Sequence, residues 1–257
     1  MTRRVAICSP LRTPVGKFLG GLSSLNAGEL GAVILKALIE RSGIDPERVD
    51  DVVFSQGYGN AEAPAIGHWS WLAAGLPLEV PGYQLDRRCG SGLQAVANAA
   101  MMVETGMADV VVAGGCESMS NVEHYTLQGR GGARMGDITL HDRLSRGRLM
   151  SQPIERFGVI TGMIETADNL AKDYAIPREL EELGLEPMLW VGGGAAAGCD
   201  PSRMGIGPVP AVERLFARRG RSWDDIDLVE LNEAFAPQVL AVLKGWGWSA
   251  DDSRRDI

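Results

Sequence analysis

The chain has 257 residues, of which 45% are hydrophobic and 23% charged, so it is long and apolar enough to bury a substantial core. Its formal net charge of −8 argues against binding to nucleic acid or to an anionic membrane surface. No apolar run approaches the roughly 18 residues that a membrane-spanning helix needs. The start, MTRRVAICSPLRTP, has too short an apolar stretch for a signal peptide.

The four cysteines, Cys8, Cys89, Cys116 and Cys199, are scattered without CxxC or CxH spacing. This distribution favours reduced thiols over disulfides or a zinc site. We therefore expect a cytoplasmic protein without a bound metal.

The first half of the chain reads as alternating strands and helices, which predicts an α/β fold with a mostly parallel sheet covered on both faces. Apolar residues at helical spacing between Leu30 and Ile39 predict a helix that Gly43 ends. The other expected elements, in chain order, are a strand at 5–8, a strand at 51–57, a helix at 65–77, an extended segment at 80–85, a helix after Cys89 and a strand within 108–115.

The character of the chain changes after this strand. Residues 119–160 show little strand alternation and predict a loop-rich excursion, and residues 164–176 predict an amphipathic helix. Residues 37–56 then resemble residues 214–233 at an offset of 177, each predicting a helix, a tight turn and a strand. Chance likeness between two such units explains this pattern as well as an internal duplication does, and a duplication predicts two similar α/β halves.

The chemistry centres on Cys89, which stands directly before Gly-Ser-Gly and a helix in DRRCGSGLQA. Unpaired N–H groups at the start of a helix favour a thiolate. The glycines let a substrate carbonyl approach the backbone, where the N–H of Cys89 could donate to an oxyanion. A nucleophile is one interpretation and a buried structural cysteine is the other. Cys8, Cys116 and Cys199 fit the structural role better.

A second candidate is Asn232 in LNEAFAPQ, directly after the expected strand at 227–231. The carboxyl end of a strand is where α/β sheets hold ligands, so its amide could hold a water or a carbonyl. The alternative is that Asn232 only caps the following helix. The three histidines, His68, His124 and His141, include no evident base for Cys89.

Six segments resemble the thiolase family and occur in thiolase order: RTPVGKFLGGL, DRRCGSGLQAV, AGGCESMS, MIETADNLAKDYAI, DPSRMGIGPVPA and LVELNEAFAPQVL. They span nearly the whole chain, and NEAF separates thiolases from the related ketoacyl synthases, which carry a histidine motif there. The resemblance implies an acyl-CoA C-acyltransferase of fatty acid metabolism. Such an enzyme acts on acetyl-CoA or another acyl-CoA, with the coenzyme A thioester as substrate and no further cofactor.

The resemblance also implies a role for particular residues. Cys89 matches the nucleophile that accepts the acyl group, and Asn232 matches the asparagine that holds the water of an oxyanion hole. Met163, Met204 and Phe235 match positions that line the acyl and pantetheine pocket.

The fold implied by the resemblance is a duplicated αβαβα arrangement with an inserted loop domain, assembled as a homodimer or homotetramer. On this basis residues 1–118 form the N-terminal thiolase half, residues 119–182 a remnant of the loop domain, and residues 183–257 a partial C-terminal half. The second half is then incomplete.

The sequence departs from the family in ways that bear on activity. Thiolases continue past the position of Ile257 into a Gly-His-Pro and a Cys-x-Gly-Gly motif, and they have a long further segment between Ile176 and Leu183. They usually have Asn where Asp86 stands and often His where Gly162 stands. Because the general base and the proton shuttle belong to the missing motifs, we expect slow acylation of Cys89 at most and negligible condensation. The alternative is a non-catalytic thiolase-like protein that binds an acyl-CoA or another protein.

Overall fold

A computed structural model of the chain describes residues 3–160, 162–174 and 194–248. These residues divide into two compact units, the first ending at Leu144 and the second beginning at Ser145. Among the residues so described, no helix combines the length and the apolar composition needed to cross a membrane.

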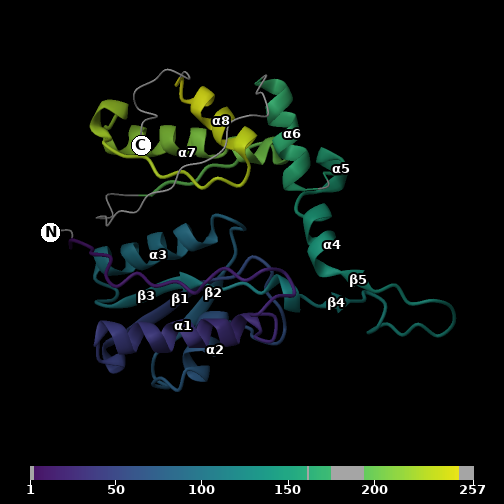
Figure 1. Ribbon diagram of the computed structural model, residues 1–257, viewed down its shortest axis with the longest axis horizontal. Coiled ribbons are helices and arrows are strands. Elements are labelled where there is room, and N and C mark those ends of the chain that lie inside the picture. Colours follow the sequence, from purple (N-terminus) through teal and green to yellow (C-terminus); the bar gives the residue numbers. More distant parts are fainter. Residues whose placement is uncertain (1–2, 161, 175–193, 249–257) are drawn as a thin grey trace. The chain divides into compact units, whose positions relative to one another are not determined.

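The first unit is built on a parallel three-stranded sheet with the order β2-β1-β3 (Figure 1). Its strands are β1 (Asp51–Ser55), β2 (Gly82–Leu85) and β3 (Val111–Gly115). The central strand β1 pairs with both neighbours, and Val52, Val53 and Phe54 in it are buried. A central parallel strand covered on both faces needs such a continuous apolar run.

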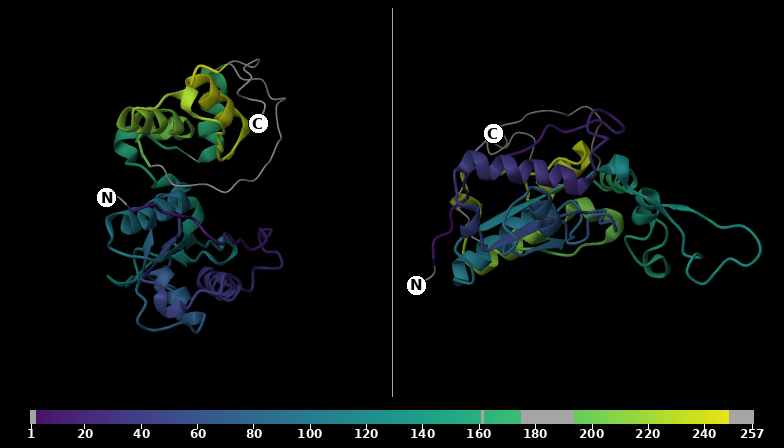
Figure 2. Two further views of the ribbon diagram at one scale, coloured as in Figure 1. Left: turned by 90° about the vertical axis from the view of Figure 1, so that its left-hand side faces the viewer. Right: turned by 90° about the horizontal axis from the view of Figure 1, so that it is seen from below.

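Helices cover both faces of this sheet. In the views of Figures 1 and 2, α1 (Ala27–Ser42) and α2 (Ile66–Ala73) lie together on one face and α3 (Ser91–Thr105) lies on the other. These elements confirm the helices and strands expected between residues 27 and 115, including the helix that follows Cys89.

The core of this unit lies between the sheet and the α1–α2 layer. Its largest fully buried side chains include Trp71, Leu35 and Ile66, and the Trp71 indole N–H donates to the Pro77 carbonyl at 2.8 Å. Helix α2 reaches the sheet closely because it presents Gly67 to it. A Cβ at this position would lie 2.7 Å from the carbonyl oxygen of Val52.

Residues 119–160 contain only short elements, as expected of a loop-rich excursion. A two-residue hairpin pairs β4 (His124–Tyr125) with β5 (His141–Asp142), and the long loop between them extends away from it (Figure 2). The other elements are η2 (Met119–Asn121), α4 (Arg143–Leu149) and α5 (Ile154–Phe157).

The second unit is helical over its described residues. It contains α6 (Met163–Asp173), η3 (Pro201–Ile206), α7 (Pro208–Arg219), η4 (Trp223–Asp225) and α8 (Ala236–Gly245). Helix α6 and α8 both pack against η3. The Asn169 amide donates to the Ser202 carbonyl at 3.2 Å, and the Gln238 amide donates to the Gly205 carbonyl at 3.4 Å.

The repeat at an offset of 177 residues is visible in the structure. Helices α1 and α7 end at equivalent positions, and each is followed by a left-handed glycine, Gly43 with φ of 66° and Gly220 with φ of 61°. The short helix η1 (Pro46–Arg48) in the first copy falls on η4 in the second. The two segments therefore share a helix end, a glycine turn and a one-turn helix.

Two strand predictions are wrong. Residues 5–8 contain only a single bridge residue, Ala6, and residues 227–231 have no regular structure. A strand exists only where a neighbouring backbone completes its ladder. In the second unit, none of the residues that the structure describes forms a strand to pair with residues 227–231, so their apolar pattern alone does not make one.

Candidate functional site

Cys89 lies on a bend between β2 and α3, where Gly90 is the N-cap of the helix and Ser91 its first residue. The bend therefore stands at the start of a 15-residue helix, as the sequence predicts. The side chain of Cys89 is exposed, which excludes the interpretation of a buried structural cysteine.

Hydrogen bonds between the residues before and after Cys89 fix the bend. The buried Ser91 hydroxyl accepts from the Arg87 N–H and donates to the Arg88 carbonyl, both at 2.6 Å. Arg88 has φ of 50°, in the left-handed region that non-glycine residues rarely adopt. Its N–H donates to the Asp86 carboxylate at 2.8 Å, which holds this conformation. Asp86, where the family usually has Asn, thus supplies a side-chain acceptor for the bend.

The carboxyl ends of all three parallel strands meet at the bend, because parallel strands end at the same edge of a sheet. Gly57 and Tyr58 follow β1, Asp86 follows β2 and Glu117 lies just beyond β3. The Glu117 carboxylate accepts from the Gly57 N–H at 2.8 Å and from the Tyr58 N–H at 3.3 Å. The Arg88 guanidinium donates to the Gly57 carbonyl and lies 5.8 Å from the centre of the Tyr58 ring.

Burial raises the pKa of Glu117 above that of an ordinary glutamic acid. The two N–H groups that it accepts from oppose this shift, Asp86 adds to it, and Arg88 opposes it. The sequence prediction missed Glu117. A polar residue directly after a buried strand, in AGGCESMS, is the signal that points to it.

The other cysteines have different surroundings. Cys116 is partly buried and packs against the core of the first unit, and burial raises its pKa to about 12, with the neighbouring Glu117 adding to the shift. Cys8 is exposed, and the prediction that it is buried is wrong because the strand expected around it does not form. The half-buried Cys199 thiol donates to the Met204 carbonyl at 3.5 Å, and burial raises its pKa.

The other four predicted site residues belong to the second unit. Met163 begins α6, Met204 lies in η3 and Phe235 is the N-cap of α8, so the three expected pocket residues stand on elements that pack together. Met204 and Phe235 are 39% and 36% exposed. Asn232 is exposed in an irregular segment. No side chain caps α8, so the interpretation of Asn232 as the cap of this helix is wrong.

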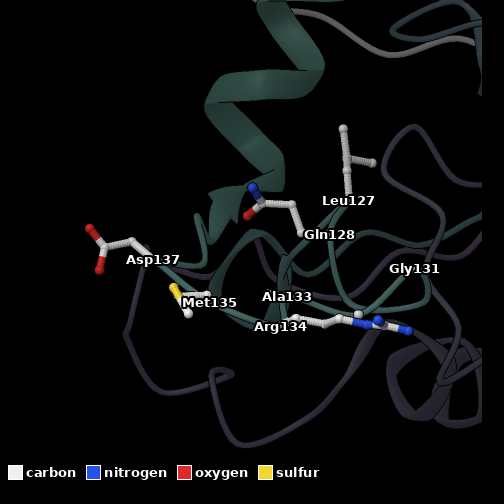
Figure 3. Close-up of a pocket in the computed structure, with 8 residues that line it drawn as sticks. Leu127, Gln128, Gly131, Ala133, Arg134, Met135 and Asp137 are labelled. Carbon is white, nitrogen blue, oxygen red and sulfur yellow. The ribbon is translucent and has the colours of Figure 1, made fainter.

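An open hollow of about 700 Å³ lies in the loop between β4 and β5. Figure 3 shows the side chains of Arg134 and Asp137, which point away from one another. None of the predicted site residues lines it. In the described ranges, no group of three or more His, Cys, Asp or Glu side chains is placed to hold a metal ion.

Comparison with known proteins decides the family. A profile described as "Thiolase, N-terminal domain" matches residues 5–182, and one described as "Thiolase, C-terminal domain" matches residues 185–253. The chain belongs to the thiolase family. Among thiolase structures, that of the Bacillus anthracis acetyl-CoA acetyltransferase is 26% identical and superposes with a TM-score of 0.83, covering 98% of this chain and 85% of that one. The α/β thiolase fold expected from the sequence is thereby confirmed.

Curated thiolases resemble the chain along nearly all of its length. The acetyl-CoA acetyltransferase of Cupriavidus necator is 32% identical, with 95% of this chain and 84% of the relative covered. The acetyl-CoA acetyltransferase of Chromobacterium violaceum is 31% identical, with 96% and 85% covered. The beta-ketoadipyl-CoA thiolase of Pseudomonas knackmussii is 31% identical, with 99% and 86% covered.

These alignments also reveal internal positions that this thiolase lacks. The match to the Chromobacterium enzyme runs over 341 positions, whereas the chain has 257 residues, so 341 less 257 leaves at least 84 positions without a residue here. This agrees with the expected internal deletion. The junction expected between Ile176 and Leu183 lies outside the described residues.

The glycine at position 162 has a local explanation. Gly162 precedes α6 with φ of 144° and ψ of −162°, a backbone conformation that a residue with a side chain rarely adopts. The histidine that many thiolases carry there would be strained in this backbone.

Proposed function

We propose that this thiolase accepts an acyl group from acetyl-CoA or another acyl-CoA on the sulfur of Cys89. The observation that carries this proposal is the exposed Cys89 thiol on a constrained bend at the start of α3. Helix N-termini favour anions, so the bend favours the negative charge that develops on the substrate oxygen when the Cys89 sulfur attacks a thioester. The enzymes named acetyl-CoA acetyltransferase among the relatives support the acetyl group as the first to test.

The reaction begins with attack of the Cys89 thiolate on the thioester carbonyl. A carbon–sulfur bond forms to Cys89, the bond to the coenzyme A sulfur breaks, and the leaving thiolate takes a proton from solvent. In this proposal Asn232 holds the water that donates to the oxyanion. Met163, Met204 and Phe235 line the space for the acyl and pantetheine chain.

Claisen condensation needs a further step, in which a base removes a proton from the α-carbon of a second acyl-CoA. The sequence contains three histidines. His68 lies in α2, where its Nδ1 is 3.2 Å from the Val80 carbonyl oxygen, and His124 and His141 lie in the β4–β5 hairpin. We expect none of them to act as this base and the chain to stop at the acyl-enzyme. Condensation is then slower by orders of magnitude.

The test is incubation of the purified chain with acetyl-CoA, followed by intact mass and peptide mapping. We expect one acetyl group on Cys89, which hydroxylamine removes as acetohydroxamate, so that Cys89 returns to the free thiol. Cys89→Ser abolishes the adduct, whereas Cys8→Ser, which removes the other exposed thiol, leaves it unchanged. Acetylation that persists in Cys89→Ser contradicts the proposal. Binding of acetyl-CoA without acylation identifies the chain instead as a non-catalytic acyl-CoA-binding protein.

We also propose that the chain assembles as a homodimer or homotetramer. Large apolar side chains are exposed in the N-terminal segment of the first unit, among them Val15, Phe18 and Leu19, at 80%, 61% and 68% exposed. Exposed apolar clusters of this kind favour association. Light scattering after size-exclusion chromatography measures the mass, and a monomer at micromolar concentration contradicts this assembly.

A further inference from the structure

A half-buried carboxyl group, that of Glu117, lies among the strand ends that meet at the bend carrying Cys89. Glu117 Oε2 accepts the N–H groups of Gly57 and Tyr58, while Oε1 is buried with no hydrogen-bond partner in the described chain. Burial of a carboxyl group with one unsatisfied oxygen is costly. What this carboxyl group holds in place is the turn that follows β1.

The turn at Gly57 and Tyr58 is in direct contact with the residue before Cys89. The Gly57 carbonyl accepts a hydrogen bond from the Arg88 guanidinium, and the Tyr58 ring lies beneath the same guanidinium. A Cβ on Gly57 would stand 4.0 Å from the Cα of Arg88, an ordinary van der Waals distance, so the two residues are neighbours. Arg88 is the left-handed residue of the bend, and a change of its φ redirects the next side chain, which is that of Cys89.

We propose that Glu117 is a positioning residue for Cys89. By holding the turn at Gly57 and Tyr58, it keeps Arg88 in its left-handed conformation and so fixes the direction of the Cys89 thiol. Glu117 acts through these residues and does not itself touch the acyl group. The relevance of this role to catalysis rests on the acyl transfer proposed above.

Two variants of the full-length chain separate the hydrogen bonds of Glu117 from its charge. Glu117→Gln keeps an oxygen that can accept from the Gly57 and Tyr58 N–H groups, whereas Glu117→Ala leaves both groups without an acceptor. The matched control is Glu123→Ala, because Glu123 also has one buried oxygen without a hydrogen-bond partner but lies beside the β4–β5 hairpin, paired with Arg143.

The first measurement is the rate at which iodoacetamide alkylates Cys89, compared with Cys8 in the same sample by peptide mass spectrometry. The second is the rate of Cys89 acylation by acetyl-CoA. We expect Glu117→Ala to slow acylation of Cys89 by acetyl-CoA about tenfold, because a misplaced reacting atom loses rate steeply. We expect the same variant to change the rate at which iodoacetamide alkylates Cys89, because the surroundings of the thiol change. In Glu117→Gln both rates of Cys89 stay within about threefold of those in the unmodified chain, since the glutamine retains an oxygen that accepts the two N–H groups. Alkylation of Cys8 is unchanged in both variants.

The pH dependence of Cys89 alkylation provides a measurement that a general loss of stability does not change. The groups that face the Glu117 carboxyl are Asp86 after β2, Arg88 on the bend, and Cys116 beside it in the chain. Protonation of Glu117 weakens its hold on the two N–H groups, so Cys89 alkylation in the unmodified chain shows an additional acidic step. Glu117→Gln lacks this step.

The outcomes that overturn the proposal are specific. Cys89 rates and pH profiles equal to those of the unmodified chain in both Glu117 variants refute it, and so does an equal loss in Glu123→Ala. If Glu117→Ala fails to fold by circular dichroism, the pH profile of Glu117→Gln decides. If acetyl-CoA never acylates Cys89 but the alkylation effects are present, the proposed function fails and the positioning role stands.

Discussion

Substitution of Gly67 by alanine tests the close contact between α2 and the sheet. The new Cβ would lie 2.7 Å from the Val52 carbonyl oxygen and 2.9 Å from that of Tyr83. Both are backbone atoms of the paired strands β1 and β2, so no flexible side chain can give way, and the helix has to move by several tenths of an ångström. Overpacking of this kind costs about 1–3 kcal/mol, against which the better helix propensity of alanine returns at most about 1 kcal/mol.

We therefore expect Gly67→Ala to lower the free energy of unfolding of the first unit by about 1–2 kcal/mol. Gly92→Ala is the matched control, because Gly92 is likewise the second residue of its helix but has open space around its Cβ position. It should be neutral or stabilising by up to about 1 kcal/mol. Urea unfolding by circular dichroism gives the free energies, and hydrogen exchange in β1 and α2 peptides assigns them to this unit. Equal stability of the two variants refutes the reasoning.

Three further predictions concern single side chains. Cys116, with a pKa of about 12, should resist iodoacetamide at pH 8 in the folded chain while the exposed Cys8 is labelled, as peptide mass spectrometry checks. Trp223 packs against three aromatic rings at centroid distances of 4.8 to 4.9 Å, so Trp223→Ala should destabilise the second unit by about 1–3 kcal/mol in urea unfolding, with loss of near-ultraviolet circular dichroism. The Asp50 carboxylate accepts from two successive N–H groups just before β3, which lower its pKa. The stabilisation from Asp50 is therefore complete above the unfolded pKa of about 3.9 and is lost as the pH falls through the lower folded pKa. The difference in melting temperature between the unmodified chain and Asp50→Asn should thus be largest at pH 6 and shrink towards pH 2.

The sequence predicted those elements whose signals are local. The helix over residues 30–39 was recognisable from its apolar spacing and from the glycine at position 43. Its actual start at Ala27 is also written in the sequence, as a capping box in which the Asn26 side chain accepts from the Glu29 N–H and the Glu29 side chain accepts from the Asn26 N–H. Strand β1 was predictable because a run buried on both faces is apolar throughout.

The wrong predictions depend on partners that the local sequence does not reveal. Residues 227–231 have a strand-like composition, but a ladder requires a second backbone at the right distance. Likewise, the position of Glu117 after β3 was visible in the sequence. Its burial and its two N–H donors arise only when the ends of β1, β2 and β3 converge. The bend at Cys89 was predictable because its features, a glycine-flanked cysteine and the following helix, are contiguous.

The order of the strands has a consequence for how the first unit forms during synthesis. The central strand β1 is the first of the three in the chain, yet its two neighbours lie 30 and 60 residues downstream, as the pairs of Val52 with Gly82 and with Val112 show. Contacts of such long range close slowly. The innermost strand thus leaves the ribosome well before its second neighbour has been translated, and a chaperone that shields this apolar segment in the interval should raise the yield of folded protein.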